Sequence, residues 1–224
     1  ILTVDCGITA HEPLQAAHDD GIDVIVIDHH LAGPVLPHAM AVVNPNRLDD
    51  ETDLGYMCAT GVCFMVCVAL IRSLREAGRA ELPDLLSVID LVALATLCDV
   101  VPVIGLNRAF IKQGLLIMRQ RRNAGIAALG GMAGLDKPVG AYECGFVLGP
   151  RINAAGRMGY SDIGAQLLCS DSHDNAVVMA LQLEELNKQR REVEKNILIH
   201  AKMVGKNVII DHYLPVVHTS IYKV

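Results

Sequence analysis

Two acids and two histidines follow short apolar runs near the start of the chain. Asp5 comes directly after residues 2–4, and Asp28, His29 and His30 come directly after residues 24–27. The interval between the two acids fits one strand-helix-strand unit, which would place both at the same edge of one parallel sheet. Ligands of open α/β sheets bind at that carboxyl edge. These residue types at this spacing predict a metal site.

Carboxylate and imidazole ligands together suit a divalent transition ion such as manganese, whereas an all-oxygen set suits magnesium or calcium. An acid beside two histidines also occurs by chance, as a helix cap. A third acid, Asp99, interrupts the apolar residues 91–98 and is either a further site residue or a helix-terminating turn residue. Asp90, in the same helical segment, is expected to pack or bond locally.

Residues 149–157 hold Arg151, Asn153 and Arg157 between glycines. The planar fork of arginine fits phosphate oxygens, and glycines let a phosphodiester backbone approach closely. The pattern predicts a phosphate-binding loop. The alternative is a loop whose arginines pair with acids of the same domain.

The composition is that of a folded chain with a substantial core, since 52% of its 224 residues are hydrophobic. The net charge of −6 argues against strong nonspecific nucleic-acid binding by the whole chain, although a local basic groove is enough for phosphate contacts. The seven cysteines include no Cys-x-x-Cys pair and fit a reducing compartment, so we expect a cytoplasmic protein. The longest apolar stretch, residues 62–71, is too short to cross a membrane.

The periodicity predicts an α/β fold: a doubly wound, mostly parallel sheet, a helical second half and a long connector helix. The long helix could instead be an outer-layer helix of its domain. One expected strand ends at Val4, and three others cover residues 23–27, 41–43 and 208–210. The expected helices cover residues 11–19, 60–78, 82–97, 107–120, a short piece near Ile126, 163–169 and 174–203, with a glycine-rich break at 129–140.

With these segments in their order, the chain resembles the DHH phosphoesterase superfamily. The resemblance rests on six groups of residues, of which the last two are similar to the branch of exonucleases that degrade single-stranded DNA in recombination and repair. The groups are residues 4–7, 26–30, 43–46, 59–62, 95–102 and 149–157.

The resemblance implies a hydrolase with a two-metal site that uses Mn²⁺ or Mg²⁺. Asp5 would bridge both ions, with His29 and Asp99 completing one of them. Asp28 would orient the site, His30 would face the scissile phosphate, and Arg151, Asn153 and Arg157 would hold the DNA. Single-stranded DNA is the implied substrate, cut in the 5′ to 3′ direction, and a single-stranded-DNA-binding protein and a helicase are implied partners.

The resemblance also implies a domain organisation: a catalytic domain over residues 1–172, a connector helix over 173–206, and the start of a smaller domain over 207–224. The family's first motif, with closely spaced acids, is expected before Ile1, so the chain alone is expected to be inactive. Two rival functions are a DHH phosphodiesterase of oligoribonucleotides or cyclic dinucleotides and a noncatalytic scaffold with the same fold.

Overall fold

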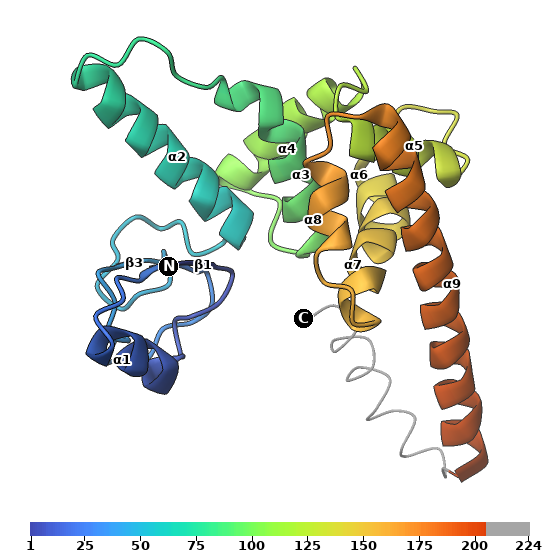
Figure 1. Cartoon of the computed structure of the whole chain (residues 1–224), viewed down its shortest axis with the longest axis horizontal. Helices are drawn as coiled ribbons and strands as arrows, with labels where there is room; N and C mark the ends of the chain where they lie inside the picture. Colours follow the sequence, from blue (N-terminus) through green and yellow to red (C-terminus); the bar gives the residue numbers. More distant parts are fainter. Residues whose placement is uncertain (205–224) are drawn as a thin grey trace. The chain divides into compact units, whose positions relative to one another are not determined.

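The computed structural model describes residues 1–204, with side chains through residue 199 (Figure 1). Two compact units divide between Ile117 and Met118. This division differs from the predicted boundary at residue 172, and the assignment of 1–172 as a catalytic domain stays a prediction. The expected strand at 208–210 and the expected domain start at 207–224 lie outside the described residues. No helix within residues 1–204 is long and apolar enough to span a membrane.

The first unit is built on a parallel sheet of three short strands, as the sequence predicts. The strands are β1 (Leu2–Val4), β2 (Ile25–Ile27) and β3 (Ala41–Val43), in the order β1-β2-β3. Val4 aligns with Ile27, and Ile27 aligns with Val43. The residues that follow each strand therefore emerge at the same carboxyl edge, which confirms the predicted placement of Asp5 and Asp28.

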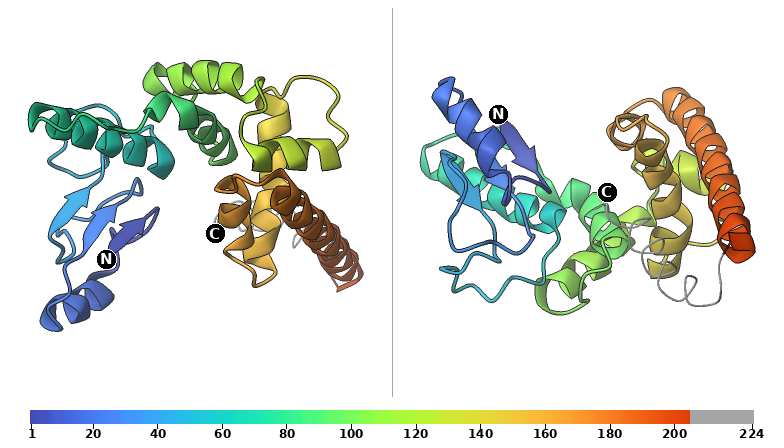
Figure 2. Two further views of the ribbon diagram at one scale, coloured as in Figure 1. Left: turned by 45° about the horizontal axis from the view of Figure 1, so that its top comes forward. Right: turned by 90° about the horizontal axis from the view of Figure 1, so that it is seen from below.

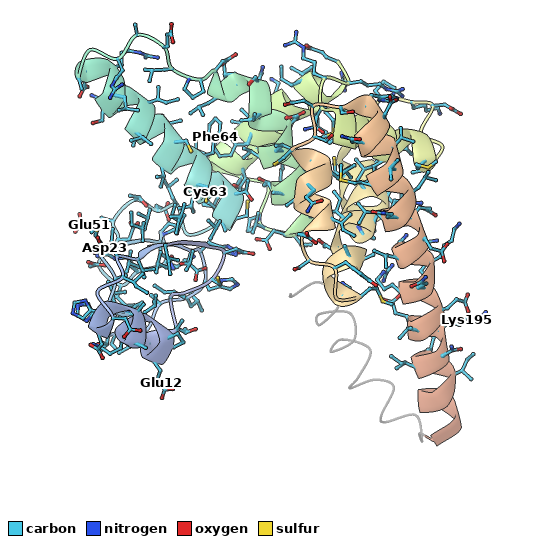
Figure 3. All side chains as sticks on the ribbon, viewed as in Figure 1. Glu12, Asp23, Glu51, Cys63, Phe64 and Lys195 are labelled. Atoms are coloured by element: carbon cyan, nitrogen blue, oxygen red, sulfur yellow. The ribbon has the colours of Figure 1, made fainter. Side chains whose placement is uncertain are left out.

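Helices cover both faces of this sheet. Helix α1 (His11–Asp19) buries Leu14 against Val24 and Val26, while Glu12 points away into solvent (Figure 3). Helix α2 (Ala59–Glu76) packs on the opposite face, so that the strands lie between α1 and α2 (Figure 2). The observed α1 matches the predicted helix at 11–19, and the doubly wound arrangement is confirmed.

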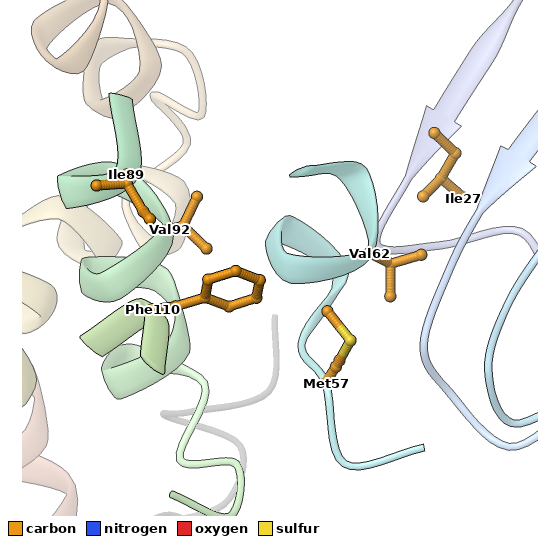
Figure 4. Close-up of a cluster of buried hydrophobic side chains, with 6 residues drawn as sticks. All are labelled: Ile27, Met57, Val62, Ile89, Val92 and Phe110. Atoms are coloured by element: carbon orange, nitrogen blue, oxygen red, sulfur yellow. The ribbon is translucent and has the colours of Figure 1, made fainter. Parts of the chain in front are cut away.

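The core of the first unit extends from the sheet to the helices that carry the later motifs. These are the 3₁₀ turn η1 (Leu85–Val88), α3 (Ile89–Cys98) and α4 (Gly105–Met118). Burial of apolar surface holds the elements together. The buried side chains of the cluster in Figure 4 are Ile27, Met57, Val62, Ile89, Val92 and Phe110.

Among the residues described, the regular elements of the second unit are all helices. Its long helix α9 (His173–Val204) packs against α5 (Ala124–Met132), α7 (Gly149–Arg157) and α8 (Ile163–Leu168). Ala176, Ala180 and Leu183 of α9 are buried, whereas Ile197 is about half exposed. The first half of α9 is thus an outer-layer helix of its unit. The unit also contains α6 (Ala141–Glu143) and the π turn η2 (Cys144–Leu148).

The segment predicted as a phosphate-binding loop is a helix, and the expectation of a loop at 149–157 is wrong. Pro150, which has no N–H to donate, stands in the first turn of α7, directly after the π turn η2. The π turn η2 joins α6 to α7 without a break. Ala154 and Ala155 are buried on the face that packs in the unit. Tertiary packing therefore overrides the low helix propensity of the glycines.

Candidate metal centre

Asp5 stands in a backbone conformation that few residues other than glycine adopt. Its φ is 65°, directly after β1, and its amide still donates to the carbonyl of Ile27 at 3.0 Å. Left-handed residues that are not glycine are uncommon, and aspartate is among those that tolerate the region. Strained positions of this kind gather at functional sites. The Asp5 side chain is 63% exposed, so its carboxylate is open to solvent and to ligands.

His29 presents one ring nitrogen to two carboxylates. Its Nε2 lies 3.2 Å from Oδ1 of Asp5 and 3.6 Å from Oδ2 of Asp99. Its Nδ1 lies 3.1 Å from the carbonyl oxygen of Met57. Because a carbonyl oxygen only accepts, Nδ1 carries the hydrogen, and Nε2 of the neutral ring directs its lone pair at the acids.

Asp99 ends α3 and also joins the site. Its amide donates to the carbonyl of Ala95 at 2.9 Å, as a helix-terminating residue would, while its carboxylate approaches His29. The next residue, Val100, has a φ of 57°. Both sequence-based interpretations of Asp99 are therefore compatible, because the turn that ends the helix brings the carboxylate to the imidazole.

Asp28 is buried and its carboxylate is fully used by hydrogen bonds. Oδ2 accepts from the Ile8 amide at 3.0 Å. Oδ1 accepts from the amides of His29 and His30 and from Nδ1 of His30 at 2.7 Å. Burial raises the pKa of this carboxyl, but the hydrogen bonds from Ile8, His30 and His29 outweigh it, and the pKa lies below its usual value. This geometry suits the orienting role expected for Asp28.

His30 is held by one nitrogen and exposed at the rest of its ring. With Nδ1 donating to Asp28, Nε2 is the nitrogen that carries the lone pair in the neutral ring, and the side chain is 57% exposed. Asp5, His29 and His30 each offer one ligand atom, and these atoms all lie within 4.8 Å of one another. His30 therefore stands close enough to act either on a substrate phosphate or as a ligand.

The electrostatics of the cluster favour a bound cation. The hydrogen bond to Asp5 raises the pKa of the His29 imidazole; burial opposes the rise, and the charge of Asp99 adds to it. Two carboxylates thus converge on a nitrogen lone pair, an arrangement that needs either a proton or a metal ion between them. A backbone carbonyl that fixes the other ring nitrogen is the usual support of a metal-ligating histidine. The residues present fit Mn²⁺ or a similar ion.

Arg151, Asn153 and Arg157 lie on α7 in the second unit. Nε of Arg151 donates to Glu184 of α9 at 2.6 Å, and Nη1 donates to the carbonyl of Val147 at 2.8 Å. The expectation that this guanidinium stays free for phosphate is wrong, because α9 brings an acid against it. Such pairing is the alternative that the sequence leaves open. The roles of the three residues in substrate binding stay predictions.

The carbonyl of Met57 is a part of the site that sequence reasoning missed. It fixes the hydrogen on His29, yet a backbone group has no residue type that a motif could reveal. Met57 itself is buried in the core of the first unit (Figure 4). Only the position of the segment before α2 gives its carbonyl a role.

Residues 1–96 match the family model described as "DHH family, N-terminal domain". The chain is 40% identical over 208 residues to the single-stranded-DNA-specific exonuclease RecJ of Escherichia coli, and 37% identical over 199 residues to that of Thermus thermophilus. These alignments cover 90% and 88% of the chain but 36% and 28% of the relatives, so the chain spans about a third of their length.

Solved structures of RecJ proteins are also similar to this chain. The chain is similar to RecJ from Thermus thermophilus in complex with Mn²⁺, with a TM-score of 0.79 and 34% identity over 92% of this chain and 30% of that one. A second similar structure is exonuclease RecJ bound to manganese, with a TM-score of 0.76 and 36% identity over 89% of this chain and 49% of that one.

Proposed function

The chain belongs to the DHH family, and on that premise we propose that it carries part of the catalytic core of a metal-dependent exonuclease. The reaction would be hydrolysis of phosphodiester bonds in single-stranded DNA from the 5′ end, in recombination and repair. Relatives named as single-stranded-DNA-specific exonucleases support the substrate, and two of the similar structures hold manganese.

One observation carries the proposal: His29 has a fixed hydrogen on Nδ1 and directs Nε2 at the carboxylates of Asp5 and Asp99. In this proposal Asp5 would be a ligand of both of two divalent ions, and His29 and Asp99 would complete the ligands of one of them. A pair of divalent ions supplies an activated water and neutralises charge on the attacking and leaving oxygens.

In this proposal the other residues either orient the site or contact the DNA. Asp28, saturated by hydrogen bonds, holds the backbone and ring of His30. With Nδ1 anchored, the exposed Nε2 of His30 faces the scissile phosphate in the proposed arrangement. On α7, Arg157 and Asn153 would contact the DNA backbone, with Arg151 acting mainly through its pairing with Glu184.

A DHH phosphodiesterase of oligoribonucleotides or cyclic dinucleotides is the second candidate. The structure supports this second candidate at one point. Arg151, one of the two arginines that favour a long nucleic-acid substrate, forms an ion pair with Glu184. A noncatalytic scaffold has less support, since a scaffold has no need of the convergence of Asp5, His29 and Asp99.

The proposed partners are a single-stranded-DNA-binding protein and a helicase, which would supply the single strand. The proposed compartment is the cytoplasm. The seven cysteines, all within residues 1–204, form no disulfide, a state that a reducing compartment preserves.

A substrate panel tests the activity. The chain, and the protein encoded by the open reading frame that contains it, would be incubated with Mn²⁺ and four labelled substrates: single-stranded DNA, duplex DNA, an oligoribonucleotide and a cyclic dinucleotide. We expect single-stranded DNA to be degraded, with release of mononucleotides from its 5′ end. Preferred cleavage of a cyclic dinucleotide would overturn the exonuclease assignment in favour of the second candidate.

Three variants test the residue roles. Asp5→Asn tolerates the left-handed backbone and removes the charge, so it should abolish hydrolysis and Mn²⁺ binding together. His30→Ala should lower turnover and leave Mn²⁺ affinity within about twofold, and His38→Ala, at an exposed histidine of the same unit, is its control. Loss of Mn²⁺ by His30→Ala would show that His30 is a ligand and that the proposed division between the histidines is wrong.

A further inference from the structure

Asn46 joins two segments of the first unit through one side-chain amide. Its Nδ2 donates to the carbonyl of His29 at 2.6 Å and to the carbonyl of Gly55 at 3.0 Å. An amide nitrogen has two hydrogens, so both are used. The amide thereby links the turn that carries His29 to the segment that contains Met57, whose carbonyl accepts from the same histidine.

Asn107 makes a second link of the same kind. Its Nδ2 donates to the carbonyl of Tyr56 at 2.7 Å and to the carbonyl of Pro102 at 2.9 Å. Pro102 follows Asp99 closely in the chain, and Tyr56 precedes Met57. The amide therefore ties the segment around Met57 to the segment that carries Asp99.

Burial of the Asn107 amide costs free energy, and its two donated hydrogen bonds are what offset this cost. The residue is fully buried, and its Oδ1 has no hydrogen-bond partner. A buried polar atom without a partner costs about 1–3 kcal/mol. A nonpolar residue would avoid that cost, so the two donated hydrogen bonds are the physical reason for an amide at this place.

We propose that Asn46 and Asn107 are positioning residues that set the separation between His29 and Asp99. The two amides connect three segments in series: the His29 turn, residues 55–57, and residues 99–102. The middle segment also holds the ring of His29 through Met57. A shift of either outer segment would change the distance from Nε2 of His29 to the Asp99 carboxylate, now 3.6 Å.

This inference rests on the proposed metal site and adds residues that do not touch the metal. Its rival is a purely structural role, in which the amides stabilise the fold and the metal site alike. The two differ in what happens to a variant that remains folded. A positioning role predicts a loss of metal affinity, because partners behind the ligands typically contribute about 10- to 100-fold in affinity.

Isosteric substitution gives the sharpest variants. Asn46→Asp and Asn107→Asp keep the shape but place a carboxylate against two carbonyl oxygens. The matched control is Asn123→Asp in the second unit, where Nδ2 donates to the carbonyl of Leu168 at 2.9 Å and Oδ1 accepts from the Ile126 amide. Aspartate at 123 keeps the cap and loses the same kind of donor. Asn46→Ala and Asn107→Ala remove the donors without adding charge.

The experiment measures Mn²⁺ binding to the full chain by counting free Mn²⁺ with electron paramagnetic resonance, after circular dichroism shows that each variant is folded in EDTA at the same temperature. We expect affinity to fall at least about tenfold in both Asp variants, less in the Ala variants, and to stay within about twofold in Asn123→Asp. The double variant Asn46→Ala/Asn107→Ala should lose less than the product of the single losses, because both act through residues 55–57.

Three results would overturn the inference. Folded Asn46 and Asn107 variants with unchanged affinity would assign the amides to the fold alone. An equal loss in Asn123→Asp would show a general effect of the substitution. Asp and Ala variants that stay unfolded with and without Mn²⁺ would show that the amides hold the whole unit. Asp5→Asn measured alongside separates the two proposals, because Mn²⁺ binding that survives it would refute the metal site itself.

Discussion

The ion pair between Arg151 and Glu184 gives the most direct test of what α7 does. The two side chains are only 11% and 21% exposed, and Arg151 also donates to the carbonyl of Val147. Arg151→Ala would remove both interactions at once. It would also leave the largely buried Glu184 carboxylate without its partner.

The expected loss of stability follows from these exposures. Removing one partner of a fully buried pair costs about 3–5 kcal/mol, and a hydrogen bond to a charged group is worth about 1.5–3 kcal/mol. Because Glu184 retains some contact with water, the cost is discounted, and we expect about 2–4 kcal/mol. Arg151→Lys should recover part of this, since it restores the charge but not the planar fork.

Native-state hydrogen exchange measured by mass spectrometry suits this chain, because it reads the opening free energy of α7 and α9 separately from the first unit. The control is Lys195→Ala in α9, whose side chain projects from the helix (Figure 3). Its contact with Glu192 at 3.9 Å joins two exposed side chains. That surface pair should contribute no more than about 0.5 kcal/mol. Glu184→Ala should resemble Arg151→Ala, and the double variant should lose little beyond either single variant.

A different result would refute the structural interpretation of Arg151. If the opening free energy of α7 changes by less than about 1 kcal/mol while single-strand binding weakens and its log-log salt slope falls by about 0.7, the guanidinium is a phosphate contact and the pairing with Glu184 contributes little.

Two further predictions concern stability. Burial raises the pKa of the Asp90 carboxyl, so the folded state favours its protonated form and loses stability as pH rises from about 4 through the folded-state pKa. Asp90→Asn should therefore raise the melting temperature at pH 7 and not at pH 3, and an equal gain at both would contradict this. In the second unit, a Cβ on Gly125 would lie 2.2 Å from the carbonyl oxygen of Leu167, so Gly125→Ala should cost about 1–3 kcal/mol in urea unfolding, whereas Gly131→Ala in the same helix has open space and should be neutral or stabilising.

The sheet and the acids at its edge could be predicted because they leave local signals. Short apolar runs without polar alternation mark strands buried on both faces, and an acid after each run marks the edge. Register follows from the strand-helix-strand connection, so Asp5 and Asp28 needed no distant information. Asp99 was harder, since a helix-ending acid and a site acid have the same local pattern.

The second unit was predicted less well because its structure depends on distant packing. Gly149 and Gly156 favour a loop at 149–157, yet this segment is helical and buries Ala154 and Ala155. The partner of Arg151 is on α9, 33 residues along the chain. No local pattern distinguishes a guanidinium that meets a phosphate from one that meets a glutamate.

The left-handed backbone of Val100 has a consequence for engineering this chain. A β-branched residue at φ 57°, with 76% of its surface exposed, holds about 1–3 kcal/mol of backbone strain that a glycine would release. A screen for thermal stability alone would thus select Val100→Gly early. The same substitution would loosen the turn that aims Asp99 at His29. Selection for heat resistance without a second screen for function would therefore give a more stable fold in which Asp99 is less well oriented toward His29.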